Sequence, residues 1–240
     1  MRYLKNVITL KILLLFTVIV NGQSKCSFTE VLNNFIQPDV KYTILKSDLN
    51  LTEALRNNET EFLGFIGENR KRLRIKFTTI NKDSIDTNCY HIQGETTVMN
   101  KNLRKFNGEF NVEKHYVFSE FLEYTNPKIV KKQGFSVLNY TLSENEELTS
   151  TGKFKGKLMI LWSQNKNGDI LYDTTLDDYD SYNNYQFYGI WTSYTTKKST
   201  LCCWGHYRIP CSGDLDWGAS EFSPNEKYHK YGWADYEFPR

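Results

Sequence analysis

Four potential metal ligands lie within ten residues near the C-terminus of this 240-residue sequence: Cys202, Cys203, His206 and Cys211. Zinc sites usually supply their ligands in pairs, roughly two to four residues apart, with a second pair at a distance. The spacing here is adjacent, then three, then five, which matches no common zinc-binding motif. We therefore expect these cysteines to form a disulfide rather than to bind a metal.

The sequence contains five cysteines, so at least one thiol stays free or bonds to another molecule. A bond between Cys203 and Cys211 would close a short loop that contains glycine and proline. Cys26 and Cys89 are the other disulfide candidates, and Cys202 is either a free thiol or the partner of one of these two. The sequence leaves the connectivity open.

Carboxylates gather in two places. Four aspartates, Asp173, Asp177, Asp178 and Asp180, lie in a tyrosine-rich stretch without the glycine and glutamate of a calcium loop, which favours a solvated loop. The second group is formed by Asp214, Asp216 and Glu221.

A glycosidase needs two carboxyl groups that face each other across a cleft, and the second group could supply them. Turn formation by Asp214 beside Gly213 is the favoured interpretation of the same residues. The histidines are scattered along the chain (His91, His115, His206 and His229). The chain also lacks a nucleophile elbow, a zinc-protease motif and a phosphate-binding loop. We therefore predict no catalytic residue, no metal and no cofactor.

Aromatic residues accumulate toward the end of the chain, where residues 172–240 hold ten of the 16 tyrosines and four of the five tryptophans. Such rings stack on sugars and provide rigid contact area for protein partners. The possible binding aromatics are Trp191, Trp204, Trp217 and Trp233. The alternative is that these rings pack over the open end of a barrel, and this alternative is favoured.

The first 22 residues resemble a secretory signal peptide. Arg2, Lys5 and Lys11 precede an apolar run from Ile12 to Val20, and Gly22 supplies a small residue at the expected cleavage site. The run is too short for a membrane-spanning helix, which needs about 20 residues. We expect a secreted or periplasmic protein without a membrane span after cleavage.

Removal of residues 1–22 changes the charge balance, because this segment holds three of the 30 basic residues and none of the 28 acidic ones. The mature chain then has 27 basic and 28 acidic residues, which gives no electrostatic reason to expect nucleic-acid binding. Its length fits one domain or a domain with an appendage.

The mature chain divides into a short helical segment, 23–60, and an antiparallel β domain, 61–240. Ser27 and Glu30 form a capping box before an apolar helical stripe that ends at Pro38, and a second short helix is expected after Asn50. From Phe62 onward the apolar residues alternate with polar ones, as in half-buried antiparallel strands. The C-terminal part, 196–240, is rich in aromatic residues and cysteines and is expected to be irregular.

The β domain carries a recurrent Phe-x-Gly pattern, which begins at Phe62, Phe106, Phe154 and Phe187. A glycine two residues after a ring leaves space on the same strand face or permits a bend. The unequal intervals argue against a repeat array. The pattern predicts a mainly β meander, either a strongly curved sheet or a barrel.

Residues Gly189-Ile-Trp191 resemble the Gly-x-Trp motif of lipocalins, which are secreted eight-stranded barrels that hold small apolar ligands. In that family the motif lies on the first strand, whereas here it follows most of the predicted strands. The resemblance therefore implies a lipocalin-like architecture at most, and no site residue is transferred.

A basic stripe runs along residues 70–76, and we expect it to pair with acidic positions such as Glu109 and Glu113 or to protect a sheet edge. The leading functional hypothesis is an exported, non-catalytic binding protein with an aromatic C-terminal surface. Its partner would be a glycan, another exported protein or a small apolar ligand. A secreted carbohydrate hydrolase that acts through Asp and Glu is the alternative.

Overall fold

The computed structural model describes residues 26–36, 38–57, 60–180 and 182–236. The predicted signal peptide, residues 1–22, lies outside these ranges. None of the helices within them has the length and apolar character needed to cross a membrane.

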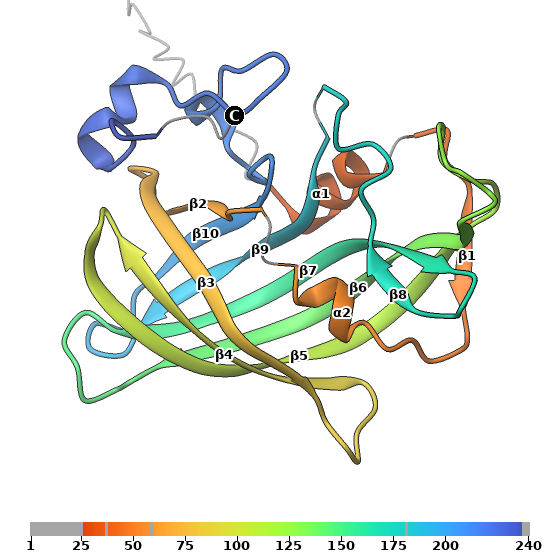
Figure 1. The fold of residues 1–240 in the computed structure, drawn as a ribbon. Helices are drawn as coiled ribbons and strands as arrows, with labels where there is room; N and C mark the ends of the chain where they lie inside the picture. The colour runs from red at the N-terminus through yellow and green to blue at the C-terminus, as the bar shows by residue number, and fades with distance from the viewer. Residues whose placement is uncertain (1–25, 37, 58–59, 181, 237–240) are drawn as a thin grey trace, which may run out of the picture.

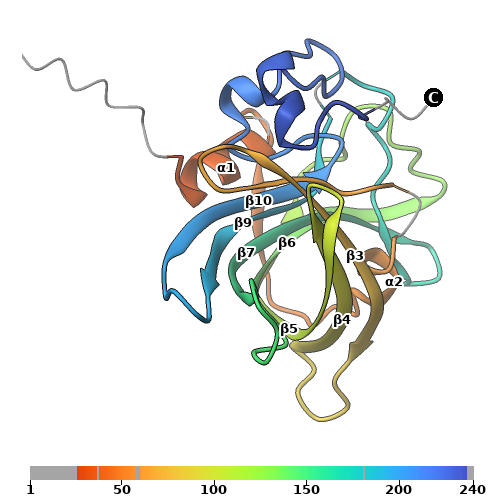
Figure 2. The same ribbon diagram turned by 90° about the vertical axis from the view of Figure 1, so that its left-hand side faces the viewer.

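The sheet forms a closed antiparallel barrel, which confirms the predicted mainly β fold (Figures 1 and 2). Eight strands pair in the ring order β2-β3-β4-β5-β6-β7-β9-β10, β10 pairs back with β2, and all the pairings are antiparallel. β1 pairs with β5, and β8 pairs with β7. The strands are β1 Tyr42–Leu45, β2 Leu63–Ile66, β3 Lys71–Lys82, β4 Cys89–Val98, β5 Lys101–Phe118, β6 Val130–Glu144, β7 Gly152–Asn165, β8 Ile170–Tyr172, β9 Asn184–Ser193 and β10 Ser199–His206.

Two short helices precede the barrel strands, as the sequence predicts. α1, Phe28–Phe35, begins with the predicted capping box of Ser27 and Glu30 and packs on the outside of the barrel. α2, Thr52–Leu55, packs its apolar residues into the same cluster as the barrel interior. The backbone N–H of Leu51 donates to the hydroxyl of Tyr90, and the hydroxyl of Tyr185 donates to the carbonyl of Leu55. These contacts close one end of the barrel.

Aromatic rings fill the barrel interior. Trp204 is fully buried, with its ring centre 4.6 Å from that of Phe187, 5.2 Å from Tyr140 and 5.9 Å from Phe154. Glycines provide the space for this packing: a Cβ on Gly189 would lie 2.2 Å from the hydroxyl oxygen of Tyr140. The Phe-x-Gly pattern thus reflects ring packing inside a barrel.

The C-terminal segment contains one strand that the sequence did not predict. Ser199–His206 forms β10, which lies between β9 and β2 and completes the ring. Cys202 and Trp204 face the interior cluster, whereas Cys203 packs in an outer cluster with Leu63 and Phe65. Because both faces of β10 are buried, its sequence lacks the alternation seen in β3 and β4.

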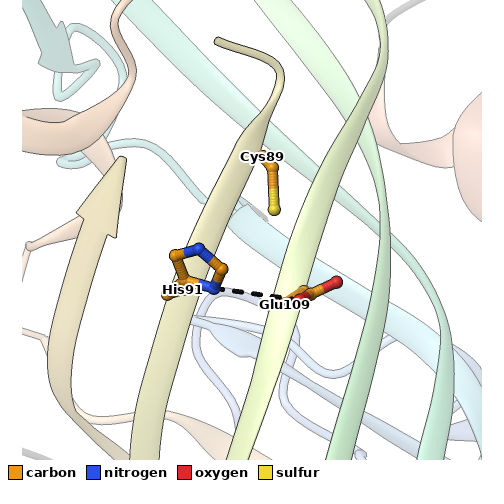
Figure 3. A group of neighbouring side chains, drawn as sticks. All are labelled: Cys89, His91 and Glu109. Carbon is orange, nitrogen blue, oxygen red and sulfur yellow. Dashed lines mark ion pairs between the residues drawn. The ribbon is translucent and has the colours of Figure 1, made fainter. Parts of the chain in front are cut away.

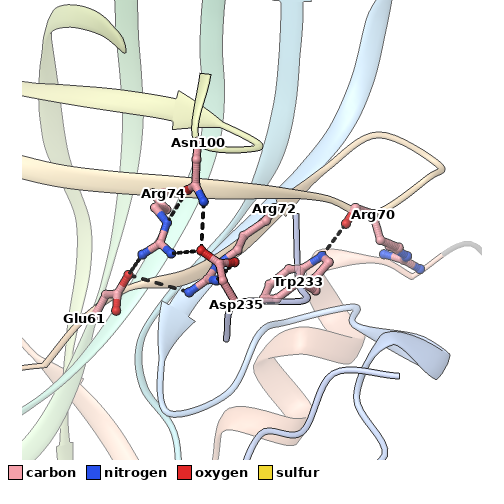
Figure 4. Close-up of polar contacts among 7 residues, drawn as sticks. All are labelled: Glu61, Arg70, Arg72, Arg74, Asn100, Trp233 and Asp235. Atoms are coloured by element: carbon pink, nitrogen blue, oxygen red, sulfur yellow. Dashed lines mark hydrogen bonds and ion pairs between the residues drawn. The ribbon is translucent and has the colours of Figure 1, made fainter. Parts of the chain in front are cut away.

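Residues 207–236 lie over the outside of β2, β3 and β10, where they contact the basic stripe (Figure 4). A guanidinium nitrogen of Arg72 lies 3.1 Å from a carboxylate oxygen of Asp235, and Arg74 pairs with Glu61 at 2.7 Å. Arg72 also lies over the ring of Trp233. The expected partners were different: Glu113 instead pairs with Lys157, and Glu109 lies near His91. The prediction for the stripe was wrong because Arg72 and Arg74 pair with Asp235, whose position depends on the fold of the distant C-terminal segment.

A disulfide joins Cys26 to Cys211, which confirms that the chain is disulfide-bonded but corrects the predicted pairing. Cys203, the expected partner of Cys211, is a buried free thiol on β10, as is Cys202 next to it. Cys89, which was named with Cys26 as a disulfide candidate, is also buried and free. The disulfide is compatible with a location outside the cytoplasm.

Candidate binding site at the barrel mouth

A cavity of about 510 Å³ lies at the end of the barrel opposite α2. The turns of four hairpins surround it, because β2–β3, β4–β5, β6–β7 and β9–β10 all reverse at this end. The apolar part of the lining consists of Ile66, Val98, Met99, Phe154 and Trp191. The volume is in the range of small-molecule sites. Apart from Gly67, the rest of the lining is polar or charged.

A buried carboxylate lies in the wall of this mouth. Glu144, at the end of β6, is 6% exposed, and its Oε1 accepts a hydrogen bond of 3.0 Å from the hydroxyl of Thr96 on β4. Its Oε2 accepts from the backbone N–H of Gly152 at 2.8 Å and from the indole Nε1 of Trp191 at 3.1 Å. Three donors from β4, β7 and β9 therefore satisfy the carboxylate, and they fix the Trp191 ring in the cavity wall.

The basic side chain beside this carboxylate is less completely bonded. Arg104, on β5, donates from its two terminal nitrogens to the carbonyls of Leu103 and Thr149. Its Nε is buried and lacks a hydrogen-bond partner among the described residues. Lys71 and Lys101 add two further cations to the lining, against the carboxylates of Glu68 and Glu144. The lining thus has three cations and two carboxylates, and one of these carboxylates, Glu144, already accepts three hydrogen bonds.

The four predicted binding tryptophans are distributed over different environments. Trp191 lines the mouth, and Trp217 is 67% exposed on the C-terminal segment. Trp204 is enclosed in the barrel, and Trp233 is buried below Arg72, where its indole donates to the carbonyl of Arg70. Of these four rings, all within the described residues, Trp191 is the one that lines the mouth cavity, and the four are spread over separate environments.

The carboxylates considered for catalysis have structural partners. Asp216 accepts from Arg208 at 2.6 Å and from two backbone N–H groups, while Asp214 bonds to Tyr228 and Lys227. Asp173 in the acidic segment is buried and accepts from Gln133 at 2.9 Å. These interactions hold loops in place.

Glu144 and Arg104 were not predicted as site residues from the sequence. Glu144 ends a strand among other polar residues, and no spacing rule connects it with Trp191, which lies 47 residues further along the chain. Its role depends on the register of four strands.

His206, which lies close in sequence to Cys202, Cys203 and Cys211, is buried inside the end of the barrel. Its Nδ1 lies 2.9 Å from the hydroxyl of Tyr172, and its ring packs 4.1 Å from that of Phe62. Burial disfavours the charged imidazolium and lowers the pKa of His206 to about 3.

This lowered pKa predicts acid sensitivity. Between pH 6 and pH 4 the unfolded chain binds a proton at His206 and the folded chain does not, so stability falls as the pH falls. The expected contribution is up to about 1.4 kcal/mol of unfolding free energy per pH unit. Denaturant titrations at several pH values should show a shallower pH slope for His206→Asn. The same substitution at the exposed His229 serves as control, and an unchanged slope in the His206 variant would contradict the assignment.

In comparisons with protein families, with curated proteins and with solved structures, nothing matches this chain.

Proposed function

We propose that this protein is an exported, non-catalytic binding protein that takes a small amphipathic ligand at the mouth of its barrel. The observation that carries the proposal is the 510 Å³ cavity with Phe154 and Trp191 in its lining. Ligand sites of this kind bury an apolar body and orient it with a few polar groups. Export is supported by the Cys26–Cys211 disulfide and by the signal-like N-terminal sequence.

The charges at the mouth favour a ligand with an anionic head group. The Glu144 carboxylate already accepts hydrogen bonds from three donors of the protein, and the lining also contains the guanidinium of Arg104. Lys71 and Lys101 raise the positive potential of the lining. The deep interior is filled with rings, so the ligand body is expected to rest at the mouth above Phe154.

The other partners considered from the sequence have less support. A glycan or protein platform would need several accessible rings, whereas Trp204 and Trp233 are buried. A carbohydrate hydrolase would need free carboxylates across a cleft, whereas Asp214 and Asp216 are bonded to neighbouring side chains. These observations favour the small ligand.

Two fluorescent probes with one ring system test the proposal: neutral N-phenyl-1-naphthylamine and its anionic sulfonate, 1-anilinonaphthalene-8-sulfonate. We expect one saturable site with energy transfer from tryptophan, and tighter, salt-sensitive binding of the sulfonate. Trp191→Ala should weaken binding of both probes at least about tenfold, because the ring supplies on the order of 1.5–3 kcal/mol of apolar contact.

Trp217→Ala is the matched control, since it removes the same side chain from an exposed position. It should leave the affinity for both probes unchanged. Circular dichroism establishes that each variant is folded. Equal affinity of the two variants, or no saturable binding of either probe, would contradict a site at the mouth.

A further inference from the structure

Three side chains with different metal-binding atoms converge on the outer surface of the barrel, away from the mouth (Figure 3). Cys89 and His91 lie two residues apart on β4, and both point outward because Tyr90 between them points into the barrel. Glu109 on β5 is the direct cross-strand neighbour of His91. The sulfur, an imidazole nitrogen and a carboxylate oxygen all lie within 4.8 Å of one another.

The imidazole of His91 is held in one orientation by a second carboxylate. Its Nε2 lies 2.7 Å from Oδ2 of Asp83. The other oxygen of Asp83 accepts hydrogen bonds from the backbone N–H groups of Ile85 and Asp86, at 2.7 and 2.8 Å. The β3–β4 turn thus positions Asp83, and Asp83 in turn positions the ring.

This orientation determines which nitrogen faces the cluster. A carboxylate only accepts hydrogen bonds, so Nε2 carries the proton that is donated to Asp83. In the neutral ring Nδ1 then has a free lone pair, and it lies 3.8 Å from Oε1 of Glu109. A metal-bound histidine commonly donates its second ring N–H to a carboxylate in this way, which fixes the tautomer.

We propose that Cys89, His91 and Glu109 bind a divalent transition metal ion, with zinc as the expected ion, and that Asp83 positions His91 for this purpose. Thiolate, imidazole and carboxylate are the three protein ligands that zinc uses, whereas calcium and magnesium require oxygen ligands only. Cys89 loses its thiol proton to solvent when the metal–sulfur bond forms. The site is independent of the ligand proposed at the mouth.

Three protein ligands leave one position of a tetrahedral ion open to water or to an external donor. A shallow groove of about 470 Å³ begins at His91 and Glu109 and continues across β4, β5 and β6. Its other side chains are mostly polar: Gln93, Asn107, Thr141 and Ser143. An external donor bound to the metal would therefore lie on a surface rich in hydrogen-bonding groups.

A metal-free account of the same geometry exists. A protonated His91 would bridge Asp83 and Glu109 as an imidazolium, and Cys89 would be a buried thiol, 7% exposed, without a role. The two accounts differ in a measurable property. The bridging imidazolium needs no ion, whereas the proposed site requires all three side chains for binding.

The test is titration with zinc alone of the mature, disulfide-bonded protein, purified without chelator or reductant and measured against a chelating indicator dye. We expect one equivalent to bind, and Cys89→Ser, His91→Gln and Glu109→Gln each to weaken binding by roughly 100-fold or more. Asp83→Asn should weaken it by roughly 10–100-fold. Cobalt should give a thiolate-to-metal charge-transfer band that persists in Asp83→Asn at higher cobalt concentration and is absent in Cys89→Ser.

Two matched controls keep the result specific. Glu95→Gln removes a carboxylate from the outward face of the same strand, and His229→Gln removes an exposed imidazole elsewhere. Neither should change the affinity. If Cys89→Ser fails to fold, the zinc affinities of His91→Gln and Glu109→Gln, whose side chains are exposed, test the proposal in its place. Absence of stoichiometric binding would overturn the proposal. So would binding that survives His91→Gln or that falls equally in the controls.

Discussion

Replacement of Trp204 by alanine is expected to lower the free energy of unfolding by about 3–5 kcal/mol, the usual cost of removing a fully buried tryptophan. The indole lies among Tyr140, Phe154 and Phe187, all of them fully or almost fully buried. These rings belong to three different strands of a closed barrel, so they cannot move together to fill the space. Thermal unfolding should shift downward by roughly 10 °C.

Trp217→Ala makes the identical change on the surface, where the side chain is 67% exposed. It should alter the unfolding free energy by less than about 0.5 kcal/mol. Urea denaturation followed by circular dichroism measures both variants without relying on tryptophan fluorescence. Similar losses in the two variants would mean that Trp204 does not occupy the barrel interior.

The sequence predicted the fold where strands are buried on one face only. β3 is an example: Leu73, Ile75 and Phe77 enter the interior cluster, and arginine and lysine alternate with them. The pattern failed at β10, because Cys202 and Cys203 are both buried, one inside the barrel and one below the C-terminal segment. A strand covered on both sides carries no period of two.

The candidate sites form only in the observed register of the paired strands, and this register could not be predicted from the sequence. Cys89 and His91 are visible as a Cys-x-His pair, but Glu109 joins them only because β4 and β5 pair in one register. A shift of one residue would turn Glu109 into the barrel. Likewise Glu144 meets Trp191 only because β7 lies between β6 and β9 in the sheet, in the observed register.

The disulfide was mispaired for a related reason. Prediction from sequence favoured the short loop between Cys203 and Cys211, since nearby cysteines meet most readily. Closure of the barrel instead brings the start of α1 next to the C-terminal segment. The hydroxyl of Tyr188 donates to the carbonyl of Cys26, and Arg70 donates to the carbonyl of Cys211 at 2.7 Å. Both ends of the bond are therefore held by the barrel wall.

Loss of this disulfide is the other change with a large expected effect. The cysteines are separated by 185 residues, so the bond restricts nearly the whole unfolded chain. The chain-entropy model gives a stabilisation of up to about 5 kcal/mol for a loop of this size. Cys26→Ser, Cys211→Ser and the double variant should all lose the same amount, because each removes the same bond. Their urea m-values should rise as the unfolded state becomes less compact.

Cys89→Ser, measured with chelator present, is the control, since it removes a free thiol and leaves the disulfide in place. Peptide mapping without reduction should recover Cys26 and Cys211 in one cross-linked peptide. The remaining thiols, those of Cys89, Cys202 and Cys203, are buried and should react with an alkylating agent only after unfolding. A peptide that links Cys203 to Cys211 would contradict the pairing.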